Sequence, residues 1–506
     1  MKIRIASTRT TRALAGLAAD YLGTGMNIAL SFVLTPWLVF LLKSEVYGFW
    51  IVATQALFWL NLLDGGSGLY LVQAISKYQG DAERINRAIA TVFWVYAVLA
   101  VPTLLIGWSI APTVCHWSHL TGATAAAGII AFRICAISAT ITLVLAPTFQ
   151  AVLFGFQKIA LVNTIVTSVA AGALVLGVIL VATGGSVVSL AVAQLVCTWA
   201  GAGVTVFMAR RLCSASVAPR FFDRKQLREV FRFSAYFQMS KAAFLGNTFS
   251  DGLLIVGALG PAAVTTYNLT QKLATTSTTF ITKVSGAVMP GLAEIFADKD
   301  FERLQRVTYR LVHLLARVSI LAATLLILLN HRFINLWIGA QFFGGLVLTA
   351  LFGYVVVRNG LIGTFSTYLF STGELKAWGW LSLTEALTKI GLTLALLPIA
   401  GLLAPAIGTV AGGLITGVYL PVKIGSMVRL RLRDLFWRGF VPVFKTSLPT
   451  VIVAVVLAVV VPDSWRWLGI AAIAAPALLV NSLSFDRAVL GRLRTEWASR
   501  NLSPEV

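Results

Sequence analysis

Five basic side chains lie deep inside long apolar segments of this chain, where a charge is costly. They are Arg133, Lys241, Lys272, Arg358 and Lys389. A cation near the centre of a bilayer is unfavourable unless it faces a partner, a cavity or a transport pathway. Arginine and lysine are also the side chains that bind phosphate oxygens most strongly. The pattern indicates a protein that handles something negatively charged inside a membrane.

Composition and length place the chain among polytopic all-α membrane proteins. Of its 506 residues, 58% are hydrophobic and 12% are charged, with a mean hydropathy of +0.86. Apolar runs recur from end to end, do not alternate as barrel strands do, and are long enough to cross ~30 Å of hydrocarbon as helices. We predict about fourteen transmembrane helices, at 15–42, 46–73, 88–111, 123–150, 159–181, 187–208, 231–257, 263–289, 309–330, 343–370, 377–398, 402–422, 443–461 and 465–483.

The net charge of +21 is distributed as a topology signal. Basic residues crowd every second connection, above all 209–230 and 423–442, whereas the opposite connections hold only Lys43, Arg332 and Arg466. The positive-inside rule then places both termini in the cytoplasm, and a nucleic-acid partner is not indicated. The first apolar run is expected to remain as an uncleaved helix. We read Cys115 to His119 as an interfacial loop and expect no metal and no cofactor.

An internal repeat divides the chain. The segment DAERINR at 81–87 is followed 219 residues later by DFERLQR at 300–306, each leading into the next span. A looser match joins LKSEVYG at 42–48 to LGPAAVT at 259–265. Six spans return the chain to its starting side, so two lobes in the same orientation are predicted, as in transporters that rock two halves about a central site. The expected domains are an N-lobe (1–208), a basic linker (209–230), a C-lobe (231–422), a second basic linker (423–442) and a final helix pair with a basic tail (443–506).

Two motifs carry a resemblance to a known family. The turn LKSEVYG at 42–48 is similar to a Leu-Gly-x-Glu-x-Tyr-Gly element that follows the first span of oligosaccharide flippases, with Lys43 where glycine is usual. The segment LLDGGSGL at 62–69 is similar to their Leu-Asp-Leu-Gly-Leu-Gly element. The chain thus resembles the Wzx-type flippases of the multidrug, oligosaccharidyl-lipid, polysaccharide (MOP) exporter superfamily, and the layout of six, six and two spans covers almost all of it.

The resemblance implies a V-shaped pair of bundles around a cationic lumen. It implies that the chain moves an undecaprenyl-diphosphate-linked oligosaccharide from the inner to the outer leaflet of a bacterial cytoplasmic membrane. The activity would be that of a transporter, not an enzyme. Partners would be the lipid-linked substrate, membrane lipids and the polymerase and glycosyltransferases of the same pathway, with the protein itself a monomer.

Depth and charge balance select the candidate substrate-binding residues. Arg133, Lys241, Lys272 and Arg358 fall near the bilayer midplane by helical rise, too deep to snorkel to the surface. Asp64 and Asp251 are candidate counter-charges or ion-coupling residues. Glu385 lies four residues before Lys389, so this pair is read as structural. Counting the four cations against Asp64 and Asp251 leaves an excess of positive charge, which suits a diphosphate. Lys283 and Arg317 lie nearer the cytoplasmic face and stay undecided.

Three other functions remain open. A peptidoglycan lipid-precursor flippase would need the same cations. A multidrug or cation antiporter should instead show a surplus of intramembrane acids. A membrane glycan polymerase or ligase would need a sizeable outward loop, and the outward connections are short. Protons, sodium and the membrane potential are the candidate energy sources, and these residues do not select one of them.

Overall fold

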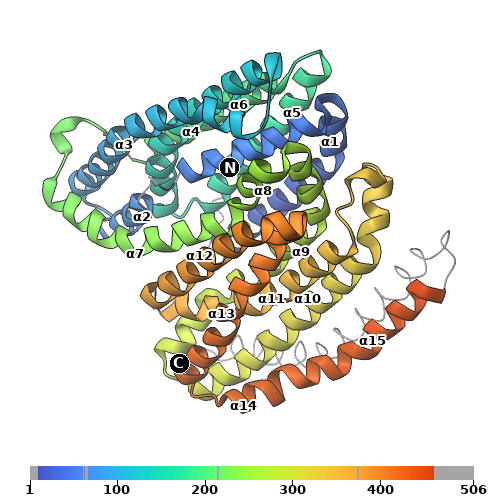
Figure 1. Ribbon diagram of the computed structural model, residues 1–506. Coiled ribbons are helices and arrows are strands. Elements are labelled where there is room, and N and C mark those ends of the chain that lie inside the picture. Colours follow the sequence, from blue (N-terminus) through green and yellow to red (C-terminus); the bar gives the residue numbers. More distant parts are fainter. Residues whose placement is uncertain (1–8, 61, 63–65, 214–215, 373–374, 461–506) are drawn as a thin grey trace, which may run out of the picture. The chain divides into compact units, whose positions relative to one another are not determined.

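A computed structural model describes residues 9–460 apart from 61, 63–65, 214–215 and 373–374, and in this part every regular element is helical (Figure 1). The principal helices are α1 (Arg9–Leu60), α2 (Ser67–Lys77), α3 (Ala82–Trp117), α4 (Gly122–Gly155), α5 (Ile159–Ala182), α6 (Val187–Leu212), α7 (Arg224–Phe249), α8 (Asp251–Leu259), α9 (Pro261–Ala297), α10 (Phe301–Trp337), α11 (Leu346–Thr372), α12 (Leu375–Ala400), α13 (Ala404–Val428) and α15 (Val441–Val460).

The prediction of a polytopic all-α membrane protein is confirmed. Within the described residues, nine helices are long and apolar enough to cross a membrane, or ten if the bent pair α7 and α8 counts as one span. Of the nine, Ala18–Leu60 contains parts of two predicted spans, and Lys376–Val428 contains two whole predicted spans. The last predicted span, 465–483, lies outside the described residues.

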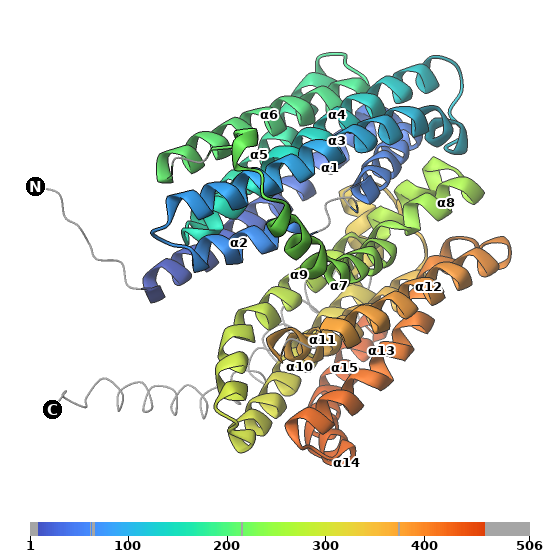
Figure 2. The ribbon, with the colours of Figure 1, turned by 90° about the vertical axis from the view of Figure 1, so that its left-hand side faces the viewer.

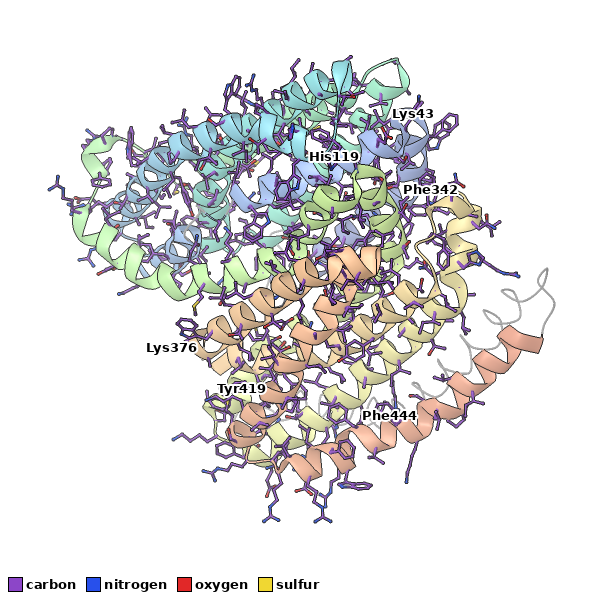
Figure 3. All side chains as sticks on the ribbon, viewed as in Figure 1. Lys43, His119, Phe342, Lys376, Tyr419 and Phe444 are labelled. Carbon is purple, nitrogen blue, oxygen red and sulfur yellow. The ribbon has the colours of Figure 1, made fainter. Side chains whose placement is uncertain are left out.

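The turn between the first two predicted spans is a single non-helical residue. Lys43 has φ 66° and ψ 160°, and α1 is helical on both sides of it (Figure 3). This backbone region is essentially reserved for glycine, because a Cβ there meets the neighbouring peptide groups. The geometry explains why glycine is the usual residue at this point of the motif, and it makes Lys43 a strained position.

Replacing Lys43 with glycine is expected to stabilise the protein. The strain relieved is about 1–3 kcal/mol, and glycine's extra backbone entropy in the unfolded chain returns about 0.5–1 kcal/mol of that. The Lys43 side chain is exposed, so little packing is lost. Thermal unfolding of the purified protein should show a higher midpoint for Lys43→Gly than for wild type. The control Lys43→Ala keeps the strained Cβ and should show no gain; equal midpoints for the two variants would refute the strain.

The second predicted span is broken in the middle. Its first half is the end of α1 and its second half is α2, which begins at Ser67 after the left-handed Gly66 (φ 73°). The amide of Gly68 donates to the Tyr96 hydroxyl at 2.9 Å. Gly66 and Gly68 therefore lie where the chain starts a new helix. Asp64, the acid of the same motif, lies outside the described residues.

The repeated acidic–basic motif forms the same helix cap twice. Asp81 accepts from the amide of Arg84 at 3.0 Å before α3, and Asp300 accepts from the amide of Arg303 at 2.9 Å before α10. An aspartate at this position satisfies an amide that has no partner within the helix. In the next turn, Arg87 pairs with Glu83 and Arg306 pairs with Glu302. The sequence repeat is thus a repeat of local structure.

The described helices belong to two compact units, each considered by itself. The first comprises Met1–Asn268 with Leu375–Gly408, and the second comprises Leu269–Glu374 with Thr409–Val506. The first unit includes α7, α8 and α12, which the sequence assigned to the C-lobe. The two units are compact parts of the chain, and they do not test the predicted lobe boundaries. The lobes stay a prediction.

The core of the first unit lies where α2, α3 and α4 pack together, and α3, α4 and α6 run side by side (Figure 2). Its fully buried side chains include Leu71 and Ile75 from α2, Ile89 and Tyr96 from α3, and Phe149 from α4, which is 2% exposed. Apolar side chains also cover much of the outer surface, for example Phe40 and Val98. Such a surface is what a lipid-facing bundle presents.

The two repeated turns contact each other inside the first unit. The Thr265 hydroxyl donates to the Ser44 carbonyl at 2.7 Å. A Cβ built on Gly48 would lie 1.9 Å from the Pro261 carbonyl oxygen, so this position has room only for a hydrogen atom. The glycine that ends the LKSEVYG motif is therefore required by the close approach of α1 and α9.

Candidate functional site

Arg133 of the first unit stacks on an aromatic ring. Its guanidinium lies over the Trp108 ring of α3, 4.6 Å from the centroid. Arg133 is the twelfth residue of α4, about 16 Å along the helix from its start, so it lies near the middle of a membrane-crossing segment. Cation–π contacts of this kind gain strength where water is excluded. Trp108 is itself 45% exposed, so one edge of the pair faces outward from the unit.

Arg358 of the second unit is held between α11 and α13. It donates to the Thr416 hydroxyl at 2.6 Å and to the side-chain oxygen of Asn359 at 3.1 Å. The guanidinium also lies directly on Gly413, where a Cβ would come within 2.4 Å of Nε. Both named oxygen partners are neutral side chains, and they orient the guanidinium. Arg358 is thus a fixed, half-buried cation about 18 Å into α11.

The glycine beneath Arg358 gives a way to move this cation without removing it. We expect Gly413→Ala to displace the guanidinium and to lower transport, because the new methyl group takes the space of Nε and Cζ. Gly417→Ala, one turn further along α13, meets nothing within 4 Å and is the matched control. Transport rates in reconstituted vesicles should fall several-fold for the first variant only. Equal rates would mean that the position of Arg358 does not matter.

The other two candidate cations lie half-buried on long helices. Lys241 is on α7, in the first unit, and Lys272 is on α9, in the second unit. The turn after Lys272 is rich in threonine, and the hydroxyls of Thr275 and Thr276 donate back to its carbonyl. The four candidates are therefore divided between the two units. A single site made of all four stays a prediction.

Lys389 makes a buried ion pair with Asp251. The Nζ atom lies 2.7 Å from Asp251 Oδ1, and the two side chains are 1% and 9% exposed. The Tyr267 hydroxyl donates to the second carboxylate oxygen at 3.1 Å. Asp251, predicted as a counter-charge or coupling residue, thus faces Lys389. Glu385, the predicted partner of Lys389, is buried one turn earlier on α12. The residues 251 and 389 are far apart in sequence, so no local spacing could have indicated this pair.

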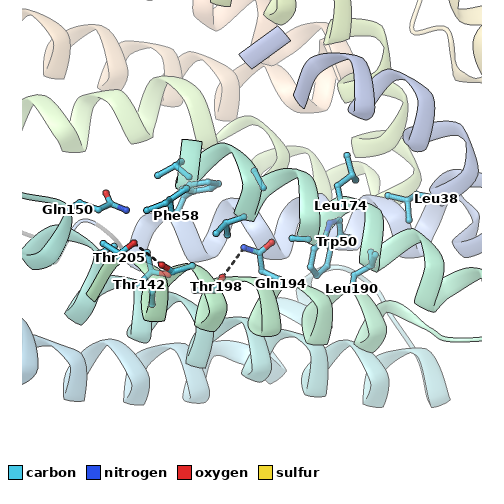
Figure 4. A pocket seen from close by; sticks show the side chains of 18 residues that line it. Leu38, Trp50, Phe58, Thr142, Gln150, Leu174, Leu190, Gln194, Thr198 and Thr205 are labelled. Carbon is cyan, nitrogen blue, oxygen red and sulfur yellow. Dashed lines mark hydrogen bonds between the residues drawn. The ribbon is translucent and has the colours of Figure 1, made fainter. Parts of the chain in front are cut away.

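A cavity of about 490 Å³ lies among α1, α4, α5 and α6 of the first unit (Figure 4). Apolar side chains form most of its wall, and the remaining lining side chains are neutral amides and hydroxyls. The hydroxyl of Thr198 accepts from the Gln194 amide at 3.4 Å and from Ser138 at 3.0 Å. No charged side chain lines this cavity, so it is not the predicted anion site. The polar lining residues are Thr142, Gln150, Gln194, Thr198 and Thr205.

This cavity was not predicted from the sequence. It is lined by residues between Leu38 and Thr205. On α6, Gln194 lies four residues before Thr198 and eleven before Thr205, and on α4, Thr142 lies eight residues before Gln150. These spacings place the polar side chains on one face of each helix. Such a face in the sequence is equally typical of helix–helix hydrogen bonds.

Comparison with known proteins agrees with this architecture. A family described as "Polysaccharide biosynthesis protein" matches residues 13–296, more than half of the chain. No curated protein sequence matches. Among solved structures, "Lipid II flippase MurJ, inward closed conformation" is similar with a TM-score of 0.74 and 14% identity, covering 93% of this chain and 99% of that one.

Two other structures show the same fold with lower scores. An inward-facing "multidrug resistance MATE family transporter of the MOP superfamily" is similar with a TM-score of 0.64 and 14% identity, over 82% of this chain and 96% of that one. An outward-facing structure with the same family description gives a TM-score of 0.58 and 14% identity over the same shares. At this identity the likeness concerns the fold. The chain therefore belongs to the polysaccharide biosynthesis protein family and has the fold of the MOP superfamily.

Proposed function

We propose that the protein is a flippase for an undecaprenyl-diphosphate-linked oligosaccharide, working from the inner to the outer leaflet of a bacterial cytoplasmic membrane with both termini in the cytoplasm. The observation that carries the proposal is the placement of Arg358, a cation oriented by Thr416 and Asn359 deep in a membrane-crossing helix. A diphosphate offers several strong acceptor oxygens to such a side chain. The family description supports export of a polysaccharide precursor.

The mechanism is alternating access. The diphosphate docks on Arg133, Lys241, Lys272 and Arg358, the glycan enters a wet lumen, and the lipid tail stays in the bilayer. Rocking of the two halves then exposes the head group on the other side. The cost of holding cations in the membrane is offset when the anionic head group is bound, so substrate and site neutralise each other during the crossing.

Charge accounting favours this substrate over a cationic drug. Asp251 is one of the two acids predicted to offset the candidate cations, and its carboxylate is 2.7 Å from Lys389. It therefore pairs with a residue outside the candidate set, and a net positive site stays part of the proposal. A site for cationic substrates would need the opposite balance.

A second candidate substrate is the peptidoglycan lipid precursor. The observation that favours it is the likeness in fold to the structure titled as a Lipid II flippase, which extends over 93% of this chain. Its head group also presents a diphosphate, so the same cations would bind it. The two candidates differ in the group that the diphosphate carries.

Leaflet exchange in vesicles tests the function. The purified protein is reconstituted with a fluorescent undecaprenyl-diphosphate-linked oligosaccharide, and a membrane-impermeant quencher reports how much label reaches the other leaflet. The proposal expects exchange well above that of protein-free vesicles. Lengthening or transfer of the glycan without exchange would identify a polymerase or ligase instead, and efflux of a cationic dye alone would identify an antiporter. Faster exchange of peptidoglycan precursor would select the second candidate.

A further inference from the structure

The ion pair lies at a break in a membrane-crossing helix. The segment formed by α7 and α8 bends by 43°, with only Ser250 between the two helices. The last four carbonyls of a helix and the first amides of the next have no partner within their own helix. In a bilayer these groups must be satisfied by other parts of the protein. Asn247 is one of the last four residues of α7, so its carbonyl needs such a partner.

Lys389 is the hydrogen-bond partner of the Asn247 carbonyl, and Asp251 is the counter-charge of Lys389. The ammonium of Lys389 donates to the Asn247 carbonyl at 2.5 Å as well as contacting Asp251. The positive charge therefore sits at the C-terminal end of α7, and the negative charge of Asp251 sits in the first turn of α8. Both signs match the helix dipoles. The hydroxyl of Ser250 also points to Asp251 Oδ1, at 3.5 Å.

The oxygens around the Lys389 ammonium are those of an alkali cation site. A carboxylate, a main-chain carbonyl at a helix break and a neighbouring hydroxyl are hard ligands, and broken helices of transporters use their C-terminal carbonyls to coordinate sodium or protons. Here the Lys389 ammonium, a monovalent cation on a side chain of α12, already occupies this place.

We propose that Lys389 is a built-in substitute for a bound monovalent metal ion at the α7–α8 break. The wild-type protein then requires no sodium or potassium at this place, and loss of the ammonium uncovers a metal site formed by Asp251 and Asn247. This inference concerns the ion requirement and does not depend on which substrate is carried.

The test is the thermal stability of lysine variants in different salts. Wild type, Lys389→Ala and Lys389→Gln are purified in detergent and unfolded in NaCl, KCl or N-methyl-glucamine chloride at equal ionic strength. The proposal expects a saturable rise of the unfolding temperature with sodium or potassium for both variants, since a ligand that binds only the folded state stabilises it. Wild type should give the same temperature in all three salts. Lys389→Gln removes the charge but keeps a polar side chain, so it serves if the alanine variant does not fold.

A double variant removes the ligand together with the lysine. Asp251→Ala combined with Lys389→Met has neither the carboxylate nor the ammonium, and should be insensitive to the salt. The proposal is overturned if neither single variant responds to sodium or potassium, or if the double variant or wild type responds as strongly as they do. In vesicles the single variants should regain transport in sodium or potassium. Salt-responsive stability combined with absent leaflet exchange in wild type would uphold this inference and reject the proposed function.

Discussion

Gly48→Ala is expected to destabilise the protein by about 3 kcal/mol or more, at the upper end of the cost of overpacking. The new Cβ would lie 1.9 Å from the Pro261 carbonyl oxygen and 2.6 Å from the carbonyl carbon. These are backbone atoms, so no side-chain rotation can make room. The start of α9 must move away from α1, and the hydrogen bond from Thr265 to the Ser44 carbonyl is then strained or lost.

The measurement is thermal unfolding of the purified variant, with Gly25→Ala as its control. Gly25 lies in the same helix, and a Cβ there meets nothing within 4 Å. Alanine at that position should be neutral or slightly stabilising, because glycine is the poorer helix former. Unfolding midpoints that are the same for the two variants would show that the two turns do not pack as described.

Breaking the buried ion pair from one side is the second large effect. Asp251→Ala leaves the Lys389 ammonium 1% exposed without its carboxylate, and such an uncompensated buried charge costs about 3–5 kcal/mol. Adding Lys389→Met removes the stranded charge with a side chain of similar length. The double variant should therefore recover most of the lost stability, since buried pairs are often replaceable by apolar residues.

The cycle of single and double variants isolates the coupling between the two residues. Yield of folded protein and unfolding midpoint are the readouts. The two single variants, Asp251→Ala and Lys389→Met, should each be less stable than the double variant. Additive losses, with the double variant the least stable, would contradict a direct interaction between these side chains.

Much of the fold could be predicted because its determinants are local. A run of apolar residues suffices to indicate a membrane-crossing helix, and the cap formed by Asp81 or Asp300 follows from the residues directly after it. The glycine usual at position 43 of the motif also has a local reason, because the backbone of the turn has a positive φ there.

The rest depends on contacts that the sequence does not encode locally. Asp251 and Lys389 meet because α8 and α12 pack together, whereas helical spacing could only suggest Glu385 as the partner. The break at Ser250 interrupts an apolar run that looks continuous. The cavity arises from four helices that each contribute a few neutral residues. None of these features has a signature within one helix.

The most direct test of the central claim compares two lipids that differ by one phosphate. Vesicles containing the protein would receive the same labelled glycan on undecaprenyl diphosphate or on undecaprenyl monophosphate, and leaflet exchange of each would be followed. The account predicts faster exchange of the diphosphate, with this preference reduced in Arg358→Ala and in the corresponding alanine variants of Arg133, Lys241 and Lys272, and retained in the exposed control Lys376→Ala. Equal exchange of both lipids by wild type, or an unchanged preference in all four variants, would contradict it.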